Sequence, residues 1–199
     1  MKIRFLLVGL LITASATSAM AAGPYIGAAG DLSIIHDSDV RVTGLAGTAT
    51  ANYDTGFGFN LSGGYNFDGP RLEGEFSYKK ADIDKLSGPG GSVKLVDSDI
   101  TVMSYMINGY YDFKTESALT PFVGVGIGLL HGEFSEPGDK TDDNAFGYQF
   151  TAGVSHSLDK KLYFDVSYRF QGAGSDFTKD GVSVSYNSSN FLAGLRYTF

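Results

Sequence analysis

The sequence predicts an all-β protein, an eight-stranded antiparallel up-and-down barrel that crosses a membrane. Apolar and polar residues alternate over eight separate segments, which is the period of a strand with two different faces. The links between these segments alternate between short and long. After the N-terminal region, no stretch approaches the roughly 20 apolar residues of a transmembrane helix. If the chain spans a bilayer, it must therefore do so as a closed barrel.

The N-terminus carries the pattern of a cleavable signal peptide. Lys2 and Arg4 precede an apolar run over residues 5–12, and small residues follow as far as Ala22. The best small-x-small cleavage match is Ala19-Met20-Ala21. We therefore expect a signal peptide over residues 1–21 and one barrel domain over residues 22–199. The chain has no cysteine, so neither lipid attachment nor a disulfide framework is expected.

The first four expected strands cover about residues 25–35, 55–67, 71–79 and 100–113. In the first, Ile26, Leu32 and Ile34 alternate with polar or small residues. The second is the clearest, with aromatic residues and leucine on one face and glycine, serine and asparagine on the other. The third alternates Leu72 and Phe76 with charged residues. The fourth sets tyrosine, isoleucine and methionine against Ser104, Asn108 and Asp112.

The last four expected strands cover about residues 121–131, 146–158, 162–172 and 184–199. The fifth alternates valine, isoleucine and leucine with Gly124, Gly126 and Gly128. The sixth and seventh alternate aromatic and aliphatic residues with polar ones. The eighth runs to the last residue, and its apolar face is formed by every second residue: Phe191, Ala193, Leu195, Tyr197 and Phe199. Each segment is near the 9 to 11 residues that a tilted strand needs to cross a bilayer.

The links favour a specific orientation in the membrane. Short links cover residues 68–70, 114–120 and 159–161, whereas long polar links cover residues 36–54, 80–99, 132–145 and 173–183. Short turns on one side and long loops on the other are the layout of an outer-membrane barrel whose two termini lie in the periplasm. Aromatic residues gather at the short-link ends, as in a periplasmic girdle: Tyr65, Phe67, Tyr111, Phe113, Tyr197 and Phe199.

Charged residues decide which face points inward, because a period of two also fits a soluble barrel with an apolar interior. In a membrane barrel, Arg71 and Lys79 would each cost up to about 2–4 kcal/mol on the lipid face. We therefore expect a lumen-facing charge network: Arg71, Glu73, Glu75, Lys79, Asp165, Arg169 and Arg196.

The network has two interpretations. It either fills and rigidifies the barrel as a polar plug, or it forms a gated ion path that opens when its pairs rearrange. An eight-stranded barrel is only just wide enough for side chains to fill it, which favours the plug. Gly124, Gly126 and Gly128 would then give room to bulky neighbours rather than leave water pockets.

Five sequence stretches together resemble the OmpA-like family of eight-stranded outer-membrane β-barrels, which includes opacity-type surface proteins and small porin-like antigens. They are Pro24-Tyr25-Ile26-Gly27, Arg71-Leu72-Glu73-Gly74-Glu75, Tyr110-Tyr111-Asp112-Phe113, Thr120 to Gly128, and Leu192 to Phe199. The resemblance covers residues 25–199. It implies a location in the outer membrane, with outer-membrane lipid and lipopolysaccharide as neighbours.

The same resemblance implies that the barrel assembly machinery reads the terminal strand, with Phe199, Tyr197, Leu195 and Phe191 as the assembly signal. It also implies a structural or surface-interaction role in which the long loops contact a host surface or another extracellular ligand. A narrow porin-like channel for small ions or solutes is the alternative. Without its signal peptide the chain has 13 bases against 22 acids, a formal charge of −9, which argues against nucleic acid as a partner.

Catalysis, a metal and a cofactor are not expected. The histidine groups are His36 with Asp37, Ser38 and Asp39, then His131 with Glu133, then His156 with Ser157. None offers a His-x-Ser pattern on a strand near the outer rim, where outer-membrane lipid A deacylases place it, because His36 to Ser38 falls in the first expected loop. The acidic residues between 133 and 143 could share a divalent cation, but their spacing does not match the EF-hand pattern, and a solvated acidic loop is the expectation.

Overall fold

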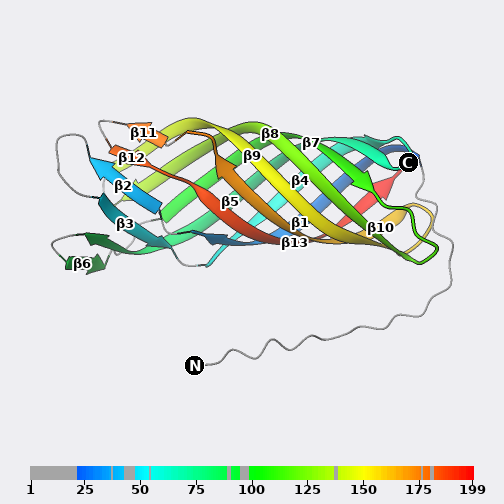
Figure 1. The fold of residues 1–199 in the computed structure, drawn as a ribbon, viewed down its shortest axis with the longest axis horizontal. Coiled ribbons are helices and arrows are strands. Elements are labelled where there is room, and N and C mark those ends of the chain that lie inside the picture. Colours follow the sequence, from blue (N-terminus) through cyan, green and yellow to red (C-terminus); the bar gives the residue numbers. More distant parts are fainter. Residues whose placement is uncertain are drawn as a thin grey trace, which may run out of the picture.

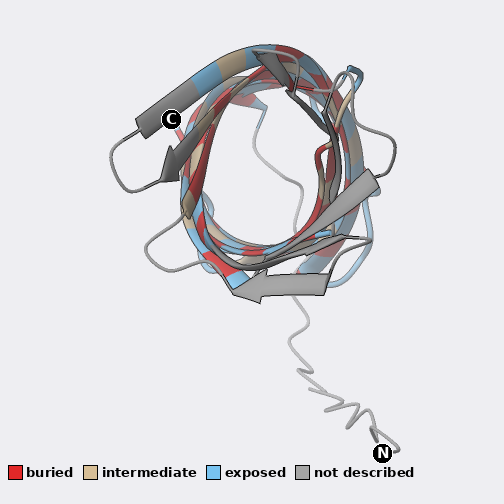
Figure 2. Cartoon of the chain, turned by 90° about the vertical axis from the view of Figure 1, so that its left-hand side faces the viewer, coloured by how far each residue is buried: buried red, intermediate tan, exposed pale blue. Residues whose placement is uncertain are grey.

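The computed structural model describes residues 22–36, 38–42, 48–53, 55–88, 91–94, 99–136, 139–175, 177–179 and 182–199. The expected signal peptide, residues 1–21, lies outside these ranges. Within them, eight long antiparallel strands form a closed barrel (Figures 1 and 2). They are β1(Gly23–Ile35), β4(Thr55–Asn66), β5(Pro70–Gly88), β7(Asp99–Asp112), β8(Leu119–Glu136), β9(Asp139–Ser157), β10(Leu162–Ala173) and β13(Asn187–Thr198). This confirms the predicted fold class.

The barrel closes between its first and last strands. Each long strand pairs with the next one along the chain, and β1 then pairs with β13, with Tyr25 opposite Thr198 and Asp31 opposite Leu192. The Phe199 backbone N–H donates to the Pro24 carbonyl at 3.0 Å. The final residue therefore continues the seam, and full closure leaves the barrel without a free edge strand. Among the residues described, no helix is long and apolar enough to cross a membrane.

The two faces of each strand differ in chemistry. Outward-facing side chains are apolar and exposed, such as Phe57 at 67%, whereas Asn60 on the inward face is only 4% exposed. The inward face of β5 is charged or polar from Arg71 to Lys79, and all of these side chains are buried. Figure 2 shows the alternation of buried and exposed residues around the wall. An apolar exterior around a polar interior is the arrangement of a barrel in a bilayer.

Short turns join the strands at the end where Phe199 lies. In the first turn, the Asn66 side-chain oxygen accepts from the N–H groups of Asp68 (2.9 Å) and Gly69 (3.1 Å). Asp68 and Gly69 both have positive φ angles, 67° and 134°, a conformation that glycine and aspartate tolerate best. In the third turn, Asp159 Oδ1 accepts from the N–H groups of Lys161 (2.6 Å) and Leu162 (3.0 Å).

Three pairs of aromatic rings surround this end. The ring centroids are 4.7 Å apart for Tyr65 and Phe67, 5.2 Å for Tyr111 and Phe113, and 5.4 Å for Tyr197 and Phe199. All six side chains are exposed on the outer wall. Aromatic rings at this level, each pair including a tyrosine with its polar hydroxyl, suit the boundary between lipid and water.

At the opposite end, the long links are not simply loops as expected, because their described parts contain strands. Strand β5 continues to Gly88, and β8 and β9 continue as a hairpin to Glu136 and Asp139. Five short strands also occur in the described parts of the links: β2(Ser38–Val42), β3(Thr48–Tyr53), β6(Gly91–Lys94), β11(Phe177–Lys179) and β12(Val182–Val184). They pair in the order β11-β12-β2-β3-β5, with β6 on β5.

The expected strands did not include these five because they are short. β2 has five residues, β3 six, and β11 and β12 three each. Val40 and Val42 do alternate with Asp39 and Arg41, but alternation over so few residues is a weak signal. The other signal is the preference of β-branched residues for extended backbone. Valine and threonine do recur in these segments, at Val40, Val42, Thr48, Thr50, Val182 and Val184.

Candidate functional site

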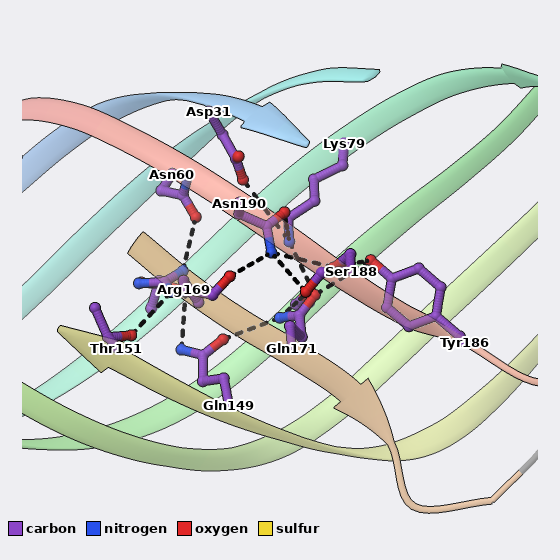
Figure 3. A network of polar contacts seen from close by, with 12 residues as sticks. Asp31, Asn60, Lys79, Gln149, Thr151, Arg169, Gln171, Tyr186, Ser188 and Asn190 are labelled. Atoms are coloured by element: carbon purple, nitrogen blue, oxygen red, sulfur yellow. Dashed lines mark hydrogen bonds and ion pairs between the residues drawn. The ribbon is translucent and has the colours of Figure 1, made fainter. Parts of the chain in front are cut away.

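The barrel interior is the densest group of polar side chains among the described residues. All seven residues of the expected charge network point inward: Arg71, Glu73, Glu75, Lys79, Asp165, Arg169 and Arg196. They come from β5, β10 and β13. Figure 3 shows part of the resulting network.

Arg169 and Glu75 form the centre of the network. Arg169 Nη1 and Nη2 each donate to one Glu75 oxygen at 2.7 Å, which is a bidentate pair. Arg169 also donates to Asn60 Oδ1 and Thr151 Oγ1, both at 3.2 Å. These bonds join strands β5, β4, β9 and β10 across the lumen.

Glu73 is held by neutral donors rather than by an arginine side chain. The Tyr25 hydroxyl donates to Glu73 Oε2 at 3.0 Å, and Asn108 Nδ2 donates to Oε1 at 3.2 Å. Asn108 in turn accepts from Gln149 Nε2 at 2.7 Å. A buried carboxylate needs such donors because its desolvation is costly.

Lys79 extends the network away from the short-turn end. Its ammonium donates to Gln171 Oε1 and Asn190 Oδ1, both at 2.9 Å, and lies 3.7 Å from Asp31 Oδ2 (Figure 3). Gln171 Nε2 donates to Gln149 Oε1 at 2.9 Å. The lysine group and the Glu73 group are thus joined through two glutamines.

Two further ion pairs lie nearer the short-turn end. Arg71 Nε donates to Asp112 Oδ1 at 3.0 Å, and its guanidinium lies 4.6 Å from the centre of the Tyr110 ring. Arg196 Nε donates to Asp165 Oδ2 at 2.9 Å, and its guanidinium lies 4.8 Å from the Tyr163 ring. Each arginine is therefore both paired and stacked, which compensates part of the cost of burial.

Several partners in the network were not named as site residues from the sequence. They are Tyr25, Asp31, Asn60, Asn108, Tyr110, Asp112, Gln149, Thr151, Gln171 and Asn190. The signal that could have found most of them is position, because they share the polar register of their strands with the charged residues.

The inward glycines of β8 give space to large neighbours. A Cβ atom on Gly124 would overlap the Tyr110 ring, and one on Gly126 would overlap Asn108 Oδ1. A small cavity of about 70 Å³ lies elsewhere in the lumen, beside Arg169, Arg196 and Gly194. It has room for a few water molecules.

A cluster of apolar side chains, here called the mouth cluster, fills the end of the lumen opposite the short turns. Its members are Ile35, Ala81, Ile100, Val102, Met106, Leu130, Ala145, Phe177 and Tyr186. Sequence reasoning did not anticipate it. Most of these residues lie at inward positions toward the strand ends opposite the short turns, or in the last long link, where the two-faced pattern predicted polar groups or loop. Met106 lies deeper, in the middle of β7 opposite Glu75.

The histidine groups do not assemble as the sequence grouped them. His36 Nε2 lies 2.9 Å from Ser189 Oγ, a pairing that the sequence did not suggest, and Ser189 Oγ also lies 2.9 Å from the Tyr168 hydroxyl. His131 Nδ1 lies 3.0 Å from Asn144 Oδ1. His156 is at the short-turn end, and its buried Nδ1 has no hydrogen-bond partner among the described residues. Asp37 lies outside the described residues.

The acidic segment is a hairpin rather than a loop in its described parts. Strands β8 and β9 place Glu133 directly opposite Asp142, and Glu136 opposite Asp139. Residues 137 and 138 lie outside the described part of the chain. Within it, no group of three or more histidine and carboxylate side chains is arranged to hold a metal ion.

Comparison with known proteins gives consistent matches. A family model described as "Outer membrane protein beta-barrel domain" matches residues 4–199. "Outer membrane protein PagN" of Salmonella typhimurium is 25% identical over 97% of this chain and 97% of its own length. A Rickettsia conorii protein named "Putative adhesin RC1281" is 28% identical over 55% of this chain and 53% of its own length. The crystal structure of Neisserial surface protein A has a TM-score of 0.64 at 22% identity, covering 90% of this chain and 99% of that one.

Proposed function

Because the chain belongs to the outer membrane protein beta-barrel family and lies in the outer membrane, we propose that it is a surface-interaction protein whose barrel is a closed anchor. The extracellular segments are the part that contacts ligands. The observation that carries this proposal is the extracellular sheet β11-β12-β2-β3-β5, which is joined to the barrel through its strand β5.

Two further observations support the anchor role. The lumen is crossed by the Arg169–Glu75 pair, whose two bonds of 2.7 Å join opposite walls. A rigid platform with extended segments on one side suits the display of a binding surface. The name of the Rickettsia relative, an adhesin, points the same way, so an extracellular or host-surface ligand is the partner proposed here.

The other proposed partners follow from location. Outer-membrane lipid and lipopolysaccharide would surround the exposed apolar wall, and the barrel assembly machinery would receive the chain before insertion. We also propose that residues 1–21 are removed as a signal peptide. The intact mass of the protein extracted from outer membranes tests this, because cleavage after Ala21 leaves a chain of 178 residues.

A non-enzymatic role is part of the proposal. The His36–Ser189 contact has the elements of a nucleophile and base, yet Ser189 lies within a ladder, opposite Ile34 on one side and Phe170 on the other. Backbone N–H groups in such a ladder already donate hydrogen bonds to carbonyl groups of the neighbouring strands. They are therefore not available to stabilise an oxyanion next to Ser189. Lipid analysis of membranes with and without the protein tests this point, and altered acyl content would contradict it.

Adhesion of cells tests the surface role. Cells producing the wild-type protein should adhere to host-cell or matrix surfaces more than cells producing a variant in which residues 38–53 are replaced by a short glycine-serine link. A variant with Phe150→Ala on the lipid face is the matched control for expression. The proposal would be overturned if this variant, and variants shortened in each of the other long links, adhered as well as the wild type.

The channel alternative is tested separately in planar bilayers. We expect no steady conductance from the wild-type protein, because paired side chains fill the lumen. A steady pore whose conductance changes on Glu73→Ala or Arg169→Ala would favour the channel over the anchor.

A further inference from the structure

The mouth cluster places apolar side chains inside the lumen, where an outer-membrane barrel otherwise carries polar ones. Val102 and Leu130 are 0% exposed, and Ile100 is 1% exposed. They come from β7 and β8, whose outward faces carry the exposed apolar residues Tyr105 and Leu129 nearby. Lipid contact on the outward face does not require apolar residues at these inward positions.

Two members of the cluster do not belong to the eight barrel strands. Phe177 begins β11, and Tyr186 immediately precedes β13, so both come from the connection between β10 and β13. Their rings lie 6.2 Å apart at 72°, the edge-to-face geometry that aromatic pairs prefer. Both side chains are 2% exposed. The last long connection therefore turns inward and places two rings within the barrel mouth.

The wall is shaped to receive these rings. A Cβ atom on Gly132 would lie 3.3 Å from the Phe177 ring, and one on Gly147 would lie 2.7 Å from Leu130. The connection is also fastened on both sides, since the Ala173 N–H donates to the Tyr186 carbonyl at 3.0 Å and the Gly174 N–H to the Phe146 carbonyl at 2.8 Å.

Tyr186 joins the cluster to the polar network below it. Its hydroxyl lies 3.0 Å from Ser188 Oγ and donates to Gln171 Oε1 at 3.4 Å (Figure 3). The ring of Tyr186 therefore packs against Phe177, and its hydroxyl bonds to Gln171 of the polar network. The interior changes from an apolar layer to a hydrogen-bonded layer at this residue.

We propose that Phe177 and Tyr186 complete a water-excluding seal at the extracellular mouth, separate from the Arg169–Glu75 closure beneath it. A lumen with one closure would open to the outside when that closure fails. Here an apolar layer excludes water and ions even if the polar pairs rearrange, because its side chains offer them no hydrogen bonds. This inference is independent of what the extracellular segments bind.

The absence of cysteine from the chain allows a direct test by single-cysteine labelling. Ser104 touches both layers: it is wholly buried, lies between Val102 and Met106 of the mouth cluster along β7, and accepts from Gln171 Nε2 at 3.3 Å. Ser167 lines the small cavity on the other side of the Arg169–Glu75 pair. The probe is a small water-soluble maleimide, applied to the folded protein in lipid nanodiscs.

With the seal intact, Ser104→Cys should react about tenfold or more slowly than Asn144→Cys on the exposed extracellular surface, because reaction at a buried site needs local opening. Adding Phe177→Ala should speed labelling of Ser104→Cys roughly tenfold or more. The same change should leave labelling of Ser167→Cys unaltered, since the Arg169–Glu75 pair still intervenes.

Phe150→Ala is the matched control, because it removes a phenylalanine ring from the lipid-facing wall and should leave the labelling of Ser104→Cys unchanged. Phe177→Leu keeps an apolar side chain and should stay close to the wild-type rate. Rapid labelling of Ser104→Cys in the otherwise wild-type barrel would overturn the seal, and this comparison holds even if Phe177→Ala does not fold. Unchanged labelling in a folded Phe177→Ala variant would overturn the role of Phe177.

Discussion

Arg169 and Glu75 face each other across the barrel with two parallel hydrogen bonds of 2.7 Å, although 94 residues separate them in the sequence. Both side chains are almost fully buried. The pair connects β10 to β5, which share no ladder. It therefore ties opposite walls of the barrel together, and its loss should affect the whole molecule.

Removing one member of this pair should destabilise the barrel strongly. Arg169→Ala or Glu75→Ala leaves a buried charge without its partner, which costs about 3–5 kcal/mol. Urea unfolding followed by the heat-sensitive shift of the folded band on gels measures the loss. The double variant Arg169→Met with Glu75→Leu should be less destabilised than either single variant.

The control for this prediction is the pair of Lys80 and Asp99 at the end opposite the short turns, 3.2 Å apart and partly exposed. Lys80→Ala should cost no more than about 1 kcal/mol, because water screens the interaction. Similar losses for the buried and the exposed pair would contradict the structural role of Arg169–Glu75.

Gly124 should be intolerant of even a methyl group. A Cβ atom there would overlap the Tyr110 ring, so Gly124→Ala must shift a buried side chain at a cost of about 1–3 kcal/mol. Gly109 provides the comparison, because it faces outward and has no atom within 4 Å of the position of a Cβ. Gly109→Ala should be neutral or stabilise by up to about 1 kcal/mol. Equal effects in unfolding measurements would show that the lumen is not tightly filled beside Tyr110.

Deleting Phe199 should impair insertion more than it weakens the finished barrel. Its ring is 60% exposed, and in the closed seam its backbone N–H donates one hydrogen bond to the Pro24 carbonyl. The truncated protein should therefore be depleted in outer membranes yet unfold close to the wild type once refolded in detergent. The control is Phe67→Ala, which removes an aromatic ring from the same end of the barrel. This variant should be inserted into the outer membrane more efficiently than the truncated chain. Equal membrane levels of the truncated and full-length proteins would argue against an assembly signal at Phe199.

The Asp159 turn should weaken in acid. The backbone N–H groups of Lys161 and Leu162 donate to the Asp159 carboxylate and lower its pKa below the ordinary value. A carboxyl with a lowered pKa in the folded state contributes stability above its unfolded pKa, near 3.9, and loses it as the pH falls through the folded value. The wild type should thus be more stable than Asp159→Asn at neutral pH, and the difference should shrink below about pH 4. A difference that persists at low pH would exclude the carboxylate as its origin.

Much of the barrel could be predicted because lipid and lumen impose opposite demands on adjacent residues. Phe57 and Asn60 fall on different faces wherever β4 ends, so period two identified the strand within a residue or two. The method missed β2 and β3, because their alternation extends over only five and six residues. It also failed at the mouth cluster, since Ile100 and Val102 are apolar at inward positions.

The sequence by itself determined the eight strands, the polar interior and the end at which the termini meet, because each follows from alternation and link length along the chain. Only the tertiary structure decided which charges pair. Arg169 could have met Glu73, and Arg71 could have met Glu75, because all four share the inward face. Barrel closure and strand register set the heights at which side chains from distant strands meet, and these place Arg169 opposite Glu75, Glu73 beside Tyr25, and Phe177 in the mouth.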